Sequence, residues 1–132
     1  MNDRRDMTHR TLKRLLANGR LTAVPKRAAD QEILLALAAS RFGPGETYLE
    51  PEVNDLLRTW LQTISEPFGI DHVTFRRMLI DSALLTRSKS GSTYRVNPEK
   101  VGHLEEIRDV DAAGVLSQIE HDRDHRKRQH AT

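Results

Sequence analysis

The chain has 132 residues, of which 37% are hydrophobic and 30% are charged, and it contains no cysteine. This length suits one modest hydrophobic core, and the absence of cysteine excludes disulfides, thiolate nucleophiles and cysteine-ligated metals. No apolar run is long enough to span a membrane, and the N-terminal MNDRRDMTHR lacks the apolar segment of a signal peptide. We therefore expect a cytoplasmic protein without membrane contact. Its net charge is only +2, but eight Lys and Arg residues fall within the first 27 residues, so the basic character is local.

Two segments make up this basic N-terminal region, residues 1–27. Leu12, Leu15 and Leu16 share one face of a predicted amphipathic helix over residues 3–18, which Asn18-Gly19 ends. The residues that follow predict an extended connector that closes on the basic pair Lys26-Arg27. A basic pair of this kind forms either a solvated surface or a contact with nucleic-acid phosphates.

The middle of the chain predicts two helices with a short strand between them. Apolar residues at helical spacing predict the first helix over residues 28–42, and Gly43-Pro44-Gly45 ends it. Residues 46–49 predict a strand, and Pro51 suits the first turn of the next helix, whose inward side includes Trp60. Residues 65–69, which include Phe68, then break the helical pattern.

Residues 71–94 predict a helix followed at once by a β-hairpin. Phe75 and Leu79 define the core side of this helix, and its polar arc consists of Thr74, Arg77 and Asp81, with Arg76 lying between two apolar stripes. Gly91 supplies the turn of the hairpin. Without the N-terminal helix, the order is helix, strand, helix, helix, strand, strand. We therefore expect a mainly α structure with a small β-hairpin (α+β), a winged helix-turn-helix-like domain over residues 28–97.

A winged helix predicts which side chains would meet double-stranded DNA. The polar arc of the helix would contact base edges or phosphates, and the hairpin would follow the backbone. The residues assigned to this hypothetical interface are Lys26, Arg27, His72, Thr74, Arg76, Arg77, Arg87, Lys89, Ser90 and Arg95. The alternatives are that Arg77 forms a surface ion pair with Asp81 and that His72 packs or caps at the helix start. Tyr94 is expected in the core or in a cross-strand pair.

The C-terminal part divides into a helical extension, residues 98–120, and a polar tail, residues 121–132, which we expect to be flexible. Val101, Leu104 and Ile107 form one short apolar stripe, and Asp111 can cap a second helix. These helices pack back on the domain, pair with a second copy in a homodimer, or remain disordered.

No other chemistry is favoured by the sequence. His121 and His125 have the spacing of two metal ligands on one helical face, but the glutamate that a metalloprotease places after the first histidine is missing. No nucleophile motif and no phosphate-binding glycine loop occurs in the sequence. We therefore predict a protein that is not an enzyme and that has no cofactor and no metal.

Four blocks of sequence occur in order, namely GRLTAVPKR, FGPGETYLEPEVNDLL, DHVTFRRMLIDSALLTR and the closing Tyr94. Together they resemble a bacterial family known as domain of unknown function 2087, and the resemblance extends from about Leu12 to Val96. It implies a winged-helix-like fold and, for relatives often fused behind an ArsR-type domain, a role in transcriptional regulation. This chain would be a version without the fused domain. It carries Ala83 where the family usually has glycine.

Two functions follow as hypotheses. The first is a DNA-binding, winged-helix transcriptional regulator. The second is a protein-interaction or small-molecule-sensing module on the same scaffold, which would use Trp60, Phe68 and the acidic C-terminal helices. The second predicts an exposed apolar patch around Trp60 or Phe68 together with an Arg77–Asp81 ion pair, whereas a free and uniformly positive helix face would count against it.

Overall fold

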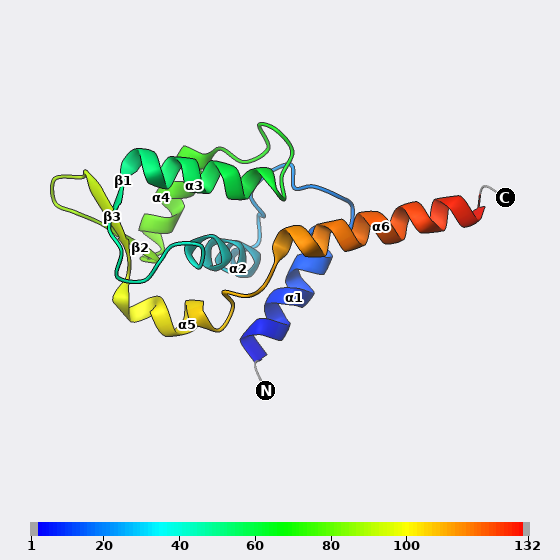
Figure 1. Ribbon diagram of the computed structural model, residues 1–132, viewed down its shortest axis with the longest axis horizontal. Coiled ribbons are helices and arrows are strands. Elements are labelled where there is room, and N and C mark those ends of the chain that lie inside the picture. Colours follow the sequence, from blue (N-terminus) through cyan, green and yellow to red (C-terminus); the bar gives the residue numbers. More distant parts are fainter. Residues whose placement is uncertain (1–2, 131–132) are drawn as a thin grey trace.

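The protein is mostly helical with one small antiparallel sheet, so the expected α+β class is confirmed (Figure 1). The computed structural model describes residues 3–130. Its elements are α1 (Asp3–Leu15), α2 (Ala28–Ala39), β1 (Tyr48–Leu49), α3 (Glu50–Gln62), α4 (His72–Asp81), β2 (Leu85–Arg87), β3 (Thr93–Val96), the 3-10 helix η1 (Pro98–Lys100), α5 (Val101–Glu105) and α6 (Ala112–His130). From α2 to β3, this is the order of elements that the sequence predicts for a winged helix.

Local signals account for most of the helix ends. Pro51 lies in the first turn of α3, where its missing N–H costs no hydrogen bond. Asp71 precedes α4, and its carboxylate accepts a hydrogen bond from the backbone N–H of Thr74 at 3.0 Å. Asp111 caps α6 in the same manner, through the N–H of Gly114 at 3.0 Å. This last contact confirms the predicted role of Asp111.

The sheet has the strand order β1-β3-β2, with both neighbouring pairs antiparallel. Tyr48 lies opposite Tyr94, and Leu85 lies opposite Val96. Because side chains alternate between the faces of a strand, Tyr94 and Val96 enter the core while Arg95 lies on the opposite face. Tyr94 is 1% exposed, which confirms its expected place in the core.

One hydrophobic core joins the N-terminal helix, the central domain and the first part of the C-terminal extension. It contains Leu12 and Leu16 from the N-terminal region, and Leu104 and Leu116 from the C-terminal extension, together with residues of the central domain. Helix α5 packs against α2, and α6 packs against α1. The apolar stripes of the C-terminal extension thus pack against the same chain, which is one of the arrangements that the sequence left open.

Helix α6 continues through His130, although we expected a flexible polar tail from residue 121. The second half of α6 extends away from the body of the molecule (Figure 1). Arg123 anchors it by donating a hydrogen bond to the carbonyl oxygen of Ala17 at 2.6 Å. Within residues 3–130, no helix is both long and apolar enough to cross a lipid bilayer.

Helix α1 is held to α2 by an ion pair at the edge of the core. Arg14 donates two hydrogen bonds to the carboxylate of Asp30, at 2.6 and 3.1 Å. Asp30 is buried, and the hydrogen bond from Arg14 is the largest cause that lowers the pKa of its carboxyl group. The paired geometry compensates for the loss of water around the carboxylate.

Candidate nucleic-acid interface

The polar side of α4 presents Arg77 to solvent. Phe75 and Leu79 on the other side of the helix are fully buried, as the helical spacing predicts. Arg77 is exposed, and among the ion pairs of residues 3–130 none joins it to Asp81. The surface ion pair considered from the sequence is therefore not formed. Thr74, also on this side, has its hydroxyl hydrogen-bonded to Asp71 at 2.8 Å, so it stabilises the helix start.

Arg76 lies inside the molecule, in contrast to its place in the hypothetical interface. Its side chain is 14% exposed, and its Nη2 atom is 3.2 Å from Oε1 of Glu50. Its Nη1 atom donates a hydrogen bond to Oδ1 of Asn54 at 2.5 Å, and its guanidinium lies 5.9 Å from the centre of the Tyr94 ring. Arg76 thus connects α4 to α3 and to β3, and we leave it out of the proposed contact surface.

The charges of this network support one another. The Tyr94 hydroxyl donates a hydrogen bond to Glu50 at 2.8 Å. This bond, followed by the charge of Arg76, lowers the pKa of the Glu50 carboxyl group. Burial, followed by the hydrogen bond to Glu50, raises the pKa of the Tyr94 hydroxyl. Near neutral pH the carboxylate is therefore ionised and the phenol is protonated, which are the states that the network requires.

The wing, defined here as residues 85–96, carries three cations that point in different directions. Arg87 lies over the Tyr94 ring at 5.7 Å and donates a hydrogen bond to the carbonyl oxygen of Gly91 at 3.2 Å. Arg95 lies on the opposite face of the hairpin, and Lys89 is exposed at the tip. Ser90 forms a hydrogen bond with Ser92 at 2.8 Å. Of the predicted wing residues, Lys89 and Arg95 are therefore the ones most available to a phosphate.

The remaining predicted residues lie at separate places. Lys26 and Arg27 are exposed and directly precede α2, where the charge of Arg27 acts on Asp30. They belong to the α2 N-terminus and not to α4 or the wing. His72 is the first residue of α4, and it lines a hollow together with Arg58 of α3.

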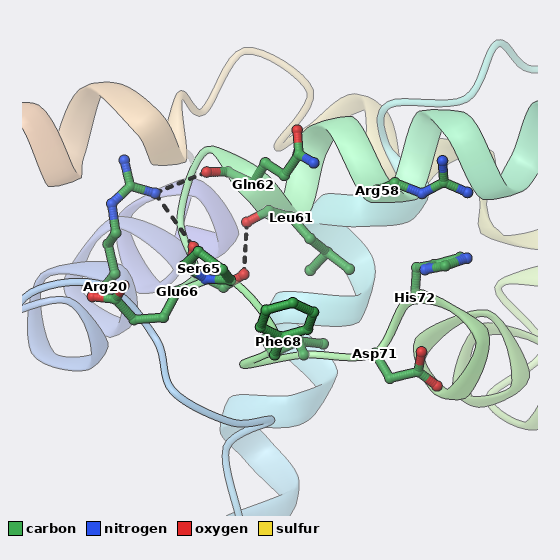
Figure 2. Close-up of a pocket in the computed structure, with 11 residues that line it drawn as sticks. Arg20, Arg58, Leu61, Gln62, Ser65, Glu66, Phe68, Asp71 and His72 are labelled. Atoms are coloured by element: carbon green, nitrogen blue, oxygen red, sulfur yellow. Dashed lines mark hydrogen bonds between the residues drawn. The ribbon is translucent and has the colours of Figure 1, made fainter.

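This hollow lies at the α3–α4 turn and measures about 780 Å³ (Figure 2). Figure 2 shows Arg20 at one end of it and Arg58 and His72 at the other. Arg20 donates hydrogen bonds to the carbonyl oxygens of Gln62 and Ser65, at 2.8 and 3.3 Å, and so caps the end of α3. Arg20 and Arg58 were not among the predicted site residues, because only the tertiary structure brings them beside α4.

Phe68 in the same turn has an unusual conformation. Its φ angle is 65°, in the left-handed region that costs a residue with a side chain about 1–2 kcal/mol. Its side chain is also fully exposed, although an apolar ring gains from burial. Trp60, in contrast, is half-buried and lies 6.5 Å from the Phe75 ring. Of the two residues named for the expected apolar patch, Phe68 is therefore fully exposed and Trp60 only partly so.

The histidine pair of the C-terminal helix gains no further metal ligand. Within residues 3–130, the structure contains no group of three or more His, Asp or Glu side chains placed to hold a metal ion. His125 instead lies 3.1 Å from the side-chain amide of Gln129, measured between the two nitrogen atoms.

The comparisons with known proteins give one match. Residues 20–96 match the model of a family described as "Uncharacterized protein conserved in bacteria (DUF2087)". No curated protein and no solved structure matches the chain. The match covers more than half of the chain, including the connector, α2 to α4 and the whole sheet. The chain therefore belongs to this bacterial family, domain of unknown function 2087.

Proposed function

We propose that this protein is a DNA-binding transcriptional regulator of the winged-helix type, which acts on bacterial chromosomal DNA in the cytoplasm without catalysing a reaction. In this proposal, α4 lies along the major groove and presents Arg77. Lys89 and Arg95 of the wing meet the phosphate backbone, and His72 with Arg58 of α3 meets it beside the start of α4.

The observation that carries the proposal is the exposed Arg77 on α4, which forms no ion pair with Asp81. A guanidinium that is free of acidic partners retains its hydrogen-bond donors for a base edge or a phosphate. The order of elements supports the same proposal, because the hairpin of β2 and β3 directly follows α4, as in a winged helix. The carboxylate of Asp81 lies on the same side of α4 and repels phosphate, which counts against the proposal at this position.

The test is a titration of labelled genomic duplex fragments with the full chain. Four phosphate contacts would make the affinity fall on the order of a hundredfold between about 50 and about 200 mM salt, because each contact releases counterions. Saturable binding with this salt dependence is the expected result. No binding at the lower salt concentration would contradict the proposal.

A second function, contact with another protein, is favoured by Phe68. A fully exposed phenylalanine in a strained conformation is typical of a binding residue, because neither feature contributes to the stability of the free chain. The absent Arg77–Asp81 ion pair favours the first function. A Phe68→Ser variant separates the two, since it should leave duplex affinity within about twofold and abolish any protein contact made by the turn.

A further inference from the structure

A second cavity lies on the other side of the domain from the α3–α4 turn, between α1, α2 and α5. Its volume is about 570 Å³, which is within the usual range for small-molecule sites. The wall of the cavity is largely apolar. Its large apolar side chains are Met7, Ile33, Leu35, Leu84, Leu104 and Ile107. Met7 is half-exposed at the cavity, and a flexible thioether side chain adapts readily to a bound molecule.

Some polar groups around this cavity form hydrogen bonds or ion pairs within the protein, and others do not. Thr8 donates its hydroxyl to the carbonyl oxygen of Arg4 at 2.7 Å, and Ser82 donates to that of Leu79 at 3.2 Å. Arg4 itself is paired with Glu106 at 2.8 Å. These groups have protein partners and are not needed to bind a ligand.

The available groups are Lys100, His103 and Glu32. All three line the cavity, and no ion pair within residues 3–130 involves any of them. Lys100 and His103 are three residues apart at the start of α5, so they lie on one helical face. The Lys100 ammonium and the His103 ring supply two hydrogen-bond donors against one carboxylate on α2, and such donors favour an anionic partner over a cationic one.

We propose that this cavity binds a small organic carboxylate with an apolar body. The apolar body occupies the space between α1, α2 and α5, and the carboxylate accepts hydrogen bonds from Lys100 and His103. The ligand would also contact Ser82 and Leu84, on either side of Ala83, the residue that connects α4 to β2. This site is separate from the proposed DNA contacts and does not depend on them.

The proposal is tested by calorimetric titration of the full chain with octanoate, octan-1-ol and octylamine. The three probes share an apolar body and differ in charge. Saturable binding of octanoate, with both other probes weaker by about tenfold or more, is expected, and tenfold corresponds to about 1.4 kcal/mol. Octan-1-ol or octylamine binding as tightly as octanoate would overturn the proposal, as would the absence of octanoate binding.

Two variants locate the site. Ala36→Leu fills part of the cavity and should weaken octanoate binding about tenfold, or 1.4 kcal/mol. Lys100→Gln removes the cation without changing the apolar wall and should weaken binding about fivefold. Lys127→Gln on the exposed part of α6 is the matched control and should have no effect. Unchanged octanoate affinity in Lys100→Gln, or in a folded Ala36→Leu protein, would contradict the assigned site.

Discussion

Arg76 of α4 and Glu50 of α3 form an ion pair of 3.2 Å that the Tyr94 hydroxyl completes from the sheet. The pair connects the helix proposed to enter the major groove with the helix before it and with the wing. It therefore fixes the relative position of the proposed DNA-contacting elements, with the Arg76 side chain largely buried. The Arg-Arg sequence of α4 thus contains one structural arginine, Arg76, and one exposed arginine, Arg77.

Replacement of Arg76 should destabilise the protein far more than replacement of Arg77. Arg76→Ala leaves Asn54 without its donor and Glu50 with only the Tyr94 hydroxyl in a partly buried place, which typically costs about 1–3 kcal/mol. Arg77→Ala is the matched control on the same helix and should change the free energy of unfolding by less than about 0.5 kcal/mol. Urea denaturation measures both values. Equal effects would show that Arg76 does not have the structural role assigned to it.

The Glu50 carboxylate should make stability depend on pH on the acidic side. Its pKa is lowered in the folded protein, by the hydrogen bond from Tyr94 first and by Arg76 second. The stabilisation is therefore present above the unfolded-state pKa of about 4.3 and is lost as the pH falls through the folded-state pKa. Glu50→Gln should reduce the loss of stability between pH 7 and pH 3, measured by denaturation at each pH. An identical loss in the wild type and the variant would contradict this effect.

Ala83→Gly should stabilise the protein. Ala83 has a φ angle of 61°, in the left-handed region that favours glycine. Glycine removes the steric cost of the left-handed conformation, although it adds freedom to the unfolded chain, so we expect a net gain of about 1 kcal/mol. Ala36→Gly in the helical α2 is the control and should lose about 1 kcal/mol. Thermal unfolding measures whether each variant gains or loses stability. Destabilisation by Ala83→Gly would contradict a backbone strain at Ala83.

The packing of α6 within its own chain should appear in the concentration dependence of unfolding. Leu116 is 2% exposed in the shared core, so Leu116→Ala should cost about 2–5 kcal/mol. Because its contacts lie within one chain, this cost should be the same at low and high protein concentration. The exposed Gln118→Ala is the control. A cost that grows with dilution would indicate that α6 packs against a second copy instead.

Local sequence patterns were sufficient to predict the order of the elements. Gly43-Pro44-Gly45 ends the region of α2, Pro51 lies at the start of α3, and Asp71 and Asp111 cap their helices, because each effect depends on a few neighbouring residues. The burial of Phe75 and Leu79 followed from helical spacing in the same way. Such signals act within one or two turns of a helix and need no tertiary information.

Contacts between distant residues were beyond this kind of inference. Arg76 binds Asn54, which lies 22 positions earlier in the sequence. The position of Arg76 between two apolar stripes of the helix left both burial and exposure open. The left-handed conformation of Phe68 is not signalled by a glycine or asparagine. Residues 121–130 form a helix although their sequence is polar, so no apolar pattern predicts it. The hydrogen bond from Arg123 to Ala17 joins residues 106 positions apart, which local patterns do not reveal.

The central claim, that α4 and the wing contact duplex DNA, is tested most directly by one comparison of variants. Duplex affinity is measured by fluorescence anisotropy at two salt concentrations for the wild type, for Arg77→Ala with Lys89→Ala, and for Arg10→Ala with Lys127→Ala. The last variant removes the same charges from exposed positions on α1 and α6.

We predict that the Arg77 and Lys89 variant loses affinity and that its salt slope decreases by about one phosphate contact, that of Lys89, whereas the control retains both within error. Equal affinity and equal salt slope in the two double variants would contradict the proposed contact surface.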